Sequence, residues 1–263
     1  MTAIVLTPSD LAIAASLIVL DAAISLWLRL GLHTRIAIAA LRMVLQLVAI
    51  GFVLRFVFTL NSPAATLGIV VVMLLVAGRE VASRPEKRLK GGANYIIGAT
   101  SVSLATLLTA VLALTTAIRP QPWFDPRYAI PLVGIILGNV LNTGSITLDV
   151  VLSGFGRERM AIEARLALGA TFSEAARPII VQGIRQGMVP TINQMSAAGI
   201  VTLPGIMTGQ ILAGMDPLEA VKYQILLMFL LAGASGLAAV VIAFLAASRM
   251  TDERQRLRLD RLV

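Results

Sequence analysis

The sequence contains no cysteine, a single histidine and few charged residues. Asp, Glu, Lys and Arg make up 14% of its 263 residues, and His33 is the one histidine. The lack of cysteine excludes disulfides and thiolate metal sites, and a lone histidine excludes a zinc site built from several histidines. The chain also lacks the Gly-x-x-x-x-Gly-Lys-Ser/Thr phosphate loop and the His-Glu-x-x-His and Gly-x-Ser-x-Gly signatures. We therefore expect no cofactor in this chain and no enzymatic activity of its own.

Apolar residues make up 57% of the chain, against roughly 45–50% in a soluble domain. Seven apolar runs are long enough to cross a hydrocarbon core of about 30 Å as helices. They cover residues 9–31, 36–60, 64–82, 94–118, 128–152, 188–212 and 218–247. None alternates apolar and polar residues as a membrane β-strand does. The sequence predicts an all-α integral membrane protein with about seven transmembrane helices, forming one domain over residues 1–263.

The basic residues predict how these helices are oriented. Of the 22 Lys and Arg residues, 18 lie in the connections after the first, third and fifth runs, in the run ends beside these connections, and in the tail 249–263. Cytoplasmic segments carry such an excess, so we expect the N-terminus outside and the C-terminus in the cytoplasm. The charged tail itself is expected to be a solvated helix or a frayed end. No pattern for reading or stacking bases accompanies the charge, so no nucleic-acid partner is expected.

The stretch 154–187 is too long for a simple turn and too polar for a span. Charged and apolar residues are mixed over 157–176, which predicts a short amphipathic helix on the cytoplasmic side. The sequence Glu163-Ala164-Arg165 is followed by Gly169-Ala170-Thr171. This spacing resembles the coupling loop of ABC transporter permeases, in which a short helix enters a cleft of the ATPase subunit. An ordinary surface helix that ends at a glycine is the alternative interpretation.

The run Leu-Pro-Gly-Ile-Met-Thr-Gly-Gln-Ile-Leu-Ala-Gly at 203–214 is similar to the FetB-type permease family. Bacterial members of that family are described as iron exporters, and plant members as half-transporters linked to aluminium tolerance and nucleotide-sugar transport. The resemblance implies a permease in the bacterial inner membrane that exports iron or a related metal ion. It also implies two copies of the chain and two copies of a separate cytosolic ATPase, which holds ATP and Mg.

Three other classes of function remain open at this point. One is an ABC transporter of a nucleotide-sugar or another organic solute. Another is an ATP-independent channel or secondary carrier, and the last is a membrane scaffold.

The predicted sixth span contains a proline and a pair of glycines with helical spacing. Pro204 removes a backbone donor and predicts a kink, whereas Gly205 and Gly209 permit close approach of another helix. A kinked helix with a flat face is typical of a gate that moves between two states. Static packing in a helix bundle explains the same residues.

Six amides lie within or beside the predicted spans, where polar groups usually face protein or water rather than lipid. They are Gln46, Asn139, Asn142, Asn193, Gln194 and Gln210. As a set they predict the lining of a polar translocation path. Individually, each could instead form hydrogen bonds between helices.

Candidate metal ligands are few. Asp21 lies near the middle of the first span, where a carboxylate serves either as a cation site or as a structural partner. The thioethers of Met195 and Met207 can bind soft metals, although methionine in apolar helices usually fills gaps in packing. If the cargo is iron, so few carboxylate and histidine ligands predict weak binding.

Overall fold

The computed structural model describes residues 7–60 and 62–263, and α-helices dominate these residues. They are α1 (Pro8–Trp27), α2 (His33–Leu60), α3 (Pro63–Ser83), α4 (Ala93–Leu112), α5 (Pro126–Arg157), α6 (Arg159–Ala167), α7 (Phe172–Ala197), α8 (Gly205–Leu212) and α9 (Pro217–Arg249). A π-helical turn, Ala113–Ile118, extends α4, and a 3-10 turn, Leu259–Arg261, lies in the tail. The described residues form isolated bridges but no β-strand, which confirms the predicted all-α class.

Six of these helices are long and apolar enough to cross a membrane. They are α1, α2, α3, α4 with its π-helical turn, α5 and α9. Each matches one of the predicted runs. The remaining run, 188–212, is not a single helix, because α7 ends at Ala197 and α8 begins at Gly205. The number of spans and the orientation of the termini stay predictions.

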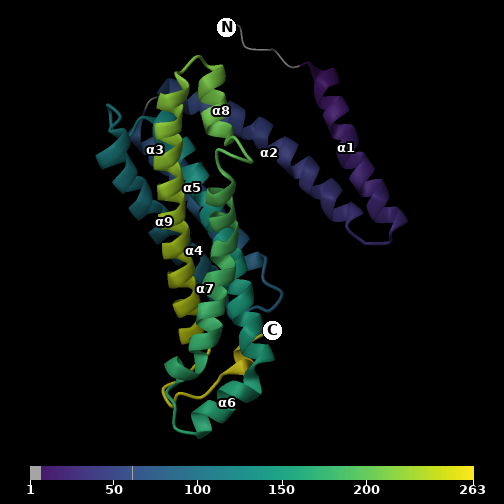
Figure 1. Ribbon diagram of the computed structural model, residues 1–263, viewed down its shortest axis with the longest axis vertical. Helices are drawn as coiled ribbons and strands as arrows, with labels where there is room; N and C mark the ends of the chain where they lie inside the picture. Colours follow the sequence, from purple (N-terminus) through teal and green to yellow (C-terminus); the bar gives the residue numbers. More distant parts are fainter. Residues whose placement is uncertain (1–6, 61) are drawn as a thin grey trace. The chain divides into compact units, whose positions relative to one another are not determined.

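The described residues form two compact units, and the first contains α1 and α2 (Figure 1). These two helices pack together, and a hydrogen bond to the side chain of Ser25 stabilises the turn between them. The buried Ser25 hydroxyl accepts a hydrogen bond from the backbone N–H of Leu32 at 3.0 Å. Most side chains of α1 and α2 are exposed, although both helices are strongly apolar. Lipid or another protein surface is the environment that suits such helices. The prediction of one permease domain over the whole chain stays a prediction.

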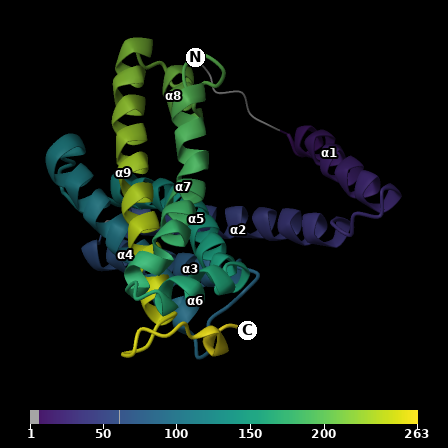
Figure 2. The same cartoon turned by 60° about the horizontal axis from the view of Figure 1, so that its bottom comes forward.

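The second unit contains the remaining helices, apart from Leu212 at the end of α8, with α5 in its middle. Helix α5 contacts α3, α4, α7 and α9, and it runs beside α7 and α9 in both views (Figures 1 and 2). Fully buried apolar side chains line these contacts, among them Ile136, Leu148 and Leu152 of α5 and Ile242 of α9. Helices α3, α5 and α9 each have a proline in the first turn. An N–H group in this turn has no partner within the helix, so proline, which lacks the N–H, costs no hydrogen bond there.

Glycines allow the helices of the second unit to approach closely. A Cβ on Gly78 of α3 would lie 2.6 Å from the Cα of Ala99 in α4, and one on Gly98 would lie 2.8 Å from the carbonyl oxygen of Gly78. A Cβ on Gly144 of α5 would lie 2.7 Å from Cδ1 of Ile242 in α9, which is the end of a side chain. Small residues at such contacts are typical of membrane helices, which associate through packing rather than through exclusion of water.

The C-terminal tail is an ordered strap, which we define as residues 250–263, so the prediction of a solvated helix or frayed end is wrong. Its backbone pairs with the loop between α3 and α4. Arg88 and Val263 exchange backbone hydrogen bonds of 3.0 and 2.7 Å, and the Lys90 N–H donates to the Arg261 carbonyl at 2.8 Å. Asp252 accepts backbone hydrogen bonds from Arg256 and Arg254. The bond from Arg256 is the main cause that lowers the pKa of Asp252. In the strap, these hydrogen bonds take the place of the hydrogen bonds that a solvated tail would form with water.

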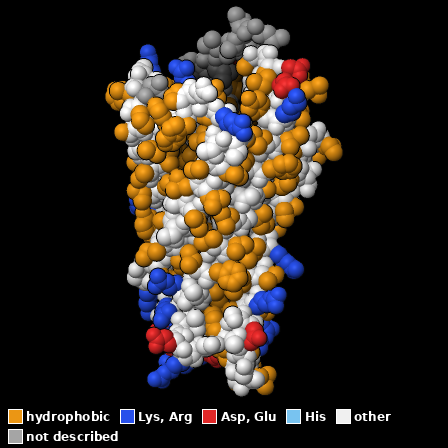
Figure 3. All heavy atoms as spheres, turned by 90° about the vertical axis from the view of Figure 1, so that its left-hand side faces the viewer, with side chains coloured by type: hydrophobic (Ala, Val, Ile, Leu, Met, Phe, Trp, Pro, Cys, Tyr) orange, Lys and Arg blue, Asp and Glu red, His pale blue; other side chains and the backbone are white. Residues whose placement is uncertain are grey.

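The loop between α3 and α4 is also fastened to α5. The Glu86 N–H donates to the Asp149 carboxylate at 2.9 Å. The buried Asn94 side chain accepts from the Leu89 N–H at 3.1 Å, which fixes the loop where α4 begins. Figure 3 shows apolar side chains over the middle of one face, with Lys and Arg at both ends and more of them toward the end that carries α6 and the strap. An apolar belt between charged ends is the surface expected of a membrane-spanning bundle.

We expect Gly78→Val to destabilise the second unit. The added side chain would meet the backbone of α4, which cannot move away as a flexible side chain can, and such overpacking costs about 1–3 kcal/mol. Gly68→Val is the matched control on the same helix, since a Cβ at Gly68 meets no atom within 4 Å. Thermal denaturation of the purified protein in detergent measures both variants. Equal melting temperatures for the two would contradict the close approach of α3 to α4.

Candidate functional site

Helix α6 joins α5 to α7 at one end of the second unit (Figure 1). Its inner face is anchored by Ile162, whose exposed fraction is 1%. The helices before and after α6 also contact each other. The ring of Phe155, near the end of α5, stacks on the ring of Phe172, at the start of α7, with centroids 5.9 Å apart. The short helix is therefore held to two of the long helices of the bundle.

A tight turn separates α6 from α7, so the predicted single helix over 157–176 is wrong. Gly169 has φ +92°, a left-handed conformation that ends a helix and that other residues adopt at a cost. Thr171 then caps α7: its hydroxyl accepts from the Glu174 N–H, and the Glu174 carboxylate accepts from the Thr171 N–H at 2.8 Å. That hydrogen bond lowers the pKa of Glu174. The glycine and the cap together start a new helix inside the predicted one.

The outer face of α6 and its turn combines two exposed apolar side chains with charges. Met160 is 77% exposed and Leu168 is 88% exposed. Glu163 forms an ion pair with Arg159 at 2.8 Å, and Arg165 donates to the Ala175 carbonyl at 3.1 Å. Ala164 is exposed and Ala170 is half-buried. The predicted coupling residues thus lie together on one short, protruding element.

A break of seven residues, 198–204, separates α7 from α8. Gly199 has φ +86°, and its N–H donates to the Thr202 carbonyl at 2.8 Å. Pro204 lies directly before α8, and its carbonyl accepts from the Thr208 N–H at 3.0 Å. The predicted continuous helix with a kink at Pro204 is therefore wrong. The left-handed glycine and the missing N–H of the proline interrupt the helix instead.

The two glycines after Pro204 lie in α8. A side chain on Gly205 or Gly209 would meet no atom within 4 Å. In the described part of the chain, this pair therefore makes no close contact with another helix, and its role in gating stays a prediction.

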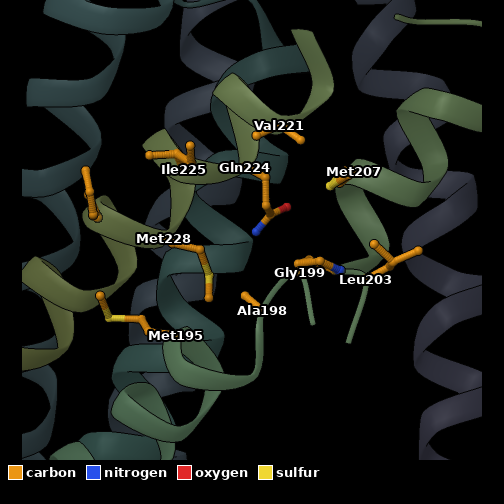
Figure 4. Close-up of a pocket in the computed structure, with 11 residues that line it drawn as sticks. Met195, Ala198, Gly199, Leu203, Met207, Val221, Gln224, Ile225 and Met228 are labelled. Carbon is orange, nitrogen blue, oxygen red and sulfur yellow. The ribbon is translucent and has the colours of Figure 1, made fainter. Parts of the chain in front are cut away.

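A cavity of about 490 Å³ lies between the break and α9 (Figure 4). It is lined by Met195, Ala198, Gly199, Leu203, Pro204, Met207, Val221, Gln224, Ile225, Met228 and Phe229. The structure thus brings Met195 and Met207, the two predicted thioether ligands, to one cavity with a further methionine. Its size is that of a small-molecule site, and its lining is apolar apart from one amide.

That amide belongs to Gln224. The side chain is 7% exposed, and Figure 4 shows its amide pointing into the space between α9 and the break. Its Oε1 atom has no hydrogen-bond partner among the described residues. An unsatisfied buried carbonyl costs about 1–3 kcal/mol, so a donor on a bound molecule would be favourable there. The sequence analysis missed Gln224, although a lone amide inside the apolar run 218–247 was a usable signal.

The predicted path amides do not line this cavity. On α5, Asn139 donates to the Ile135 carbonyl at 3.3 Å and Asn142 accepts from Arg84 at 3.4 Å. Elsewhere, Asn193, Gln194 and Gln46 are exposed, whereas Gln210 is half-buried. The role of these amides as path residues stays a prediction.

The structure describes no group of three or more His, Asp or Glu side chains, over residues 7–60 and 62–263, that could hold a metal ion. Asp21 is exposed on α1, in the first unit, whereas Met195 and Met207 belong to the second. A metal role for these three residues stays a prediction.

Comparisons with known proteins match the chain over most of its length. The family described as "Uncharacterised protein family (UPF0014)" matches residues 8–251. The UPF0014 membrane protein slr1647 of Synechocystis sp. is 36% identical over 90% of this chain and 92% of its own. The probable iron export permease protein FetB of Escherichia coli is 31% identical over 96% and 95%. The protein ALUMINUM SENSITIVE 3 of Arabidopsis thaliana is 30% identical over 82% and 77%. No solved structure matches the chain.

Replacement of Gly199 by alanine is expected to destabilise the break beside the cavity. Alanine in the left-handed conformation costs roughly 1–2 kcal/mol. Gly209→Ala is the control, because that glycine lies inside α8 with open space around it, where alanine stabilises a helix by up to ~1 kcal/mol. Unfolding in mixed SDS and maltoside micelles measures both changes. A Gly199→Ala variant as stable as the wild type would argue against the left-handed turn.

Proposed function

Because this chain belongs to the UPF0014 family of membrane proteins, we propose that it is the membrane-spanning permease subunit of an ATP-driven exporter. The proposed cargo is iron or a related metal ion, since the Escherichia coli relative is named a probable iron export permease. In this proposal, two copies of the chain assemble in the membrane with two copies of a cytosolic ABC ATPase. The ATPase holds ATP and Mg and performs the hydrolysis.

The observation that carries the proposal is that α6 has one buried side and one exposed side with apolar residues on it. It is a short helix that protrudes from the bundle, with Met160 and Leu168 exposed on its outer side and Ile162 buried on its inner side. Exposed apolar side chains surrounded by charges are typical of a surface that meets a partner. The predicted coupling residues, Glu163 to Thr171, lie on this helix and its turn. We propose that this surface docks into the ATPase.

Helix α7 provides the mechanical link from the docking surface to the cavity. It begins beside α6 at Phe172 and ends at Ala197, where the break starts. Its 26 residues span about 39 Å at 1.5 Å per residue. A rigid-body movement of α6, driven by closure of the ATPase pair, would therefore shift the wall of the cavity that the break forms.

The lining of the cavity limits how tightly a metal ion can bind there. It contains thioethers and the Gln224 amide but no carboxylate or imidazole. Fe²⁺ is a borderline ion whose protein sites are usually built from imidazole and carboxylate ligands, so we expect weak binding. In this proposal the ion keeps part of its water shell, and a bound water donates to Gln224. Weak binding suits a transporter, since the cargo has to leave on the other side.

The size and apolar lining of the cavity favour a second candidate, a small organic solute with one hydrogen-bond donor. A nucleotide-sugar is less suited, because no Lys or Arg lines the cavity to neutralise its phosphates.

We expect Leu168→Glu to weaken association with the ATPase at least tenfold, because a carboxylate would replace an apolar contact at the docking surface. Leu168→Met is the matched control, since it keeps an apolar side chain of similar size. Co-purification from detergent and ATP hydrolysis by the complex measure the effect. Leu168 is 88% exposed in the chain alone, so neither change should affect folding. Full association of Leu168→Glu would refute the docking role of α6, and transport without any ATPase would favour a channel or carrier.

In cells loaded with iron, the chain expressed with its ATPase should lower the total iron content. Gln224→Leu should slow this export roughly tenfold, as expected for loss of one hydrogen bond of about 1.4 kcal/mol. Gln182→Leu is the control, because Gln182 is exposed on α7 outside the cavity. Elemental analysis of washed cells provides the measurement. Unchanged metal contents, with an assembled complex that hydrolyses ATP, would move the assignment to an organic solute.

A further inference from the structure

A small basic pocket lies at the end of the second unit that carries the strap. Its volume is about 330 Å³, and it is lined by Leu89, Lys90, Gly91, Ala93, Arg249 and Arg261. Three segments meet there: the loop between α3 and α4, the last residue of α9, and the strap. None of its residues lines the cavity beside the break, so it is a separate site.

Hydrogen bonds to backbone carbonyls bring the three cationic residues of this pocket together. The Lys90 N–H donates to the Arg261 carbonyl at 2.8 Å, and a guanidinium N–H of Arg261 donates to the Arg249 carbonyl at 2.7 Å. The same guanidinium group also donates to the Thr251 carbonyl at 3.0 Å. The fold of the strap thus holds Arg261 between Lys90 and Arg249. The ammonium group of Lys90 and the guanidinium group of Arg249 form no hydrogen bond with any described residue.

Among the described residues, Lys90 and Arg249 lack acidic partners, whereas Arg261 interacts electrostatically with Asp260, which is itself ion-paired with Arg258. Within residues 7–60 and 62–263, no carboxylate forms an ion pair with Lys90, Arg249 or Arg261. Neighbouring arginines of the strap are different: Arg256 is paired with Asp252, and Arg258 with Asp260. Like charges held close together repel one another, and a bound anion would relieve that repulsion. The pocket therefore has the charge of an anion site that the protein itself neutralises only in part.

The backbone around the pocket is open to a ligand. Gly91 and Gly92 have φ of +69° and +74°, and a side chain at either position would meet no atom within 4 Å. The first residue of α4, Ala93, lines the pocket, so the positive end of a helix of 20 residues opens on it. Backbone N–H groups at such an end favour phosphate oxygens. The partial positive charge of this helix end adds to the positive charge of the Lys90, Arg249 and Arg261 side chains.

The position of the pocket along the bundle indicates where the anion comes from. Arg249 is the last residue of α9, a helix long and apolar enough to cross the membrane. The apolar run of α9 ends at Ala247, two residues before Arg249, so Arg249 lies at the edge of the hydrocarbon core, at the level of the lipid headgroups. Basic pockets between helices at this level bind anionic headgroups. We propose that Lys90, Arg249 and Arg261 bind the phosphate of an anionic phospholipid, a function independent of the proposed transport.

The test compares lipid binding by the purified full chain in detergent, measured by native mass spectrometry. Phosphatidylglycerol and phosphatidylcholine are the lipid probes, and inorganic phosphate is the probe for a free anion. Lys90→Gln with Arg249→Gln should weaken phosphatidylglycerol binding about tenfold or more and leave phosphatidylcholine binding unchanged. Both substitutions spare the hydrogen bonds that hold the strap, because Lys90 and Arg249 contribute backbone atoms to them.

Arg177→Gln with Arg254→Gln is the matched control, because it removes the same charge from exposed positions outside the pocket. Unchanged phosphatidylglycerol binding in this control supports the proposal, and an equal loss would overturn it. Lys90→Arg should retain binding, which distinguishes a charge effect from a folding defect. Equal binding of both lipids by the wild type would overturn the proposal. Displacement of phosphatidylglycerol by millimolar inorganic phosphate would overturn the assignment to a lipid.

Discussion

Close packing around α5 is the constraint on which the second unit depends. This helix contacts each of the other four long helices, and glycines of α3, α5 and α7 let backbones approach where a side chain would collide. In lipid, packing of this kind replaces the exclusion of water that drives soluble proteins to fold. Helix α5 is also long enough to extend beyond the packed region, so Phe155 near its end can stack on Phe172. The same helix therefore both organises the bundle and holds the short helix α6 in place.

The two parts of the candidate site are joined by one continuous element. Helix α7 leaves the turn after α6 and reaches the break that forms a wall of the cavity. A break inside a membrane protein exposes backbone groups that need partners, so it is tolerated where protein or a water-filled cavity surrounds it. Broken helices that line a cavity are common at the sites of transporters. The break and the cavity thus belong together physically.

Sequence reasoning predicted the long apolar helices well, because length and composition alone decide whether a segment can cross a membrane. It also placed the residues predicted to couple to an ATPase on one short element. It failed to predict where helices end when a turn or a cap lies inside an apolar or mixed segment. The left-handed turn at Gly199 is invisible to a count of apolar residues, and the cap at Thr171 was overlooked within a mixed segment. The strap and the burial of Gln224 depend on contacts between segments far apart in the sequence, which no local pattern contains.

The pairing of the strap with the loop between α3 and α4 has a consequence for biosynthesis. Leu89 and Leu262 form a bridge although almost the whole second unit separates them along the chain. Domains form from the N-terminus onward as the ribosome extends the chain. The loop between α3 and α4 therefore remains unpaired until nearly every other helix has been inserted and the strap has been synthesised. Closure of the strap is then one of the last events of assembly, and a chain truncated before the strap cannot complete it.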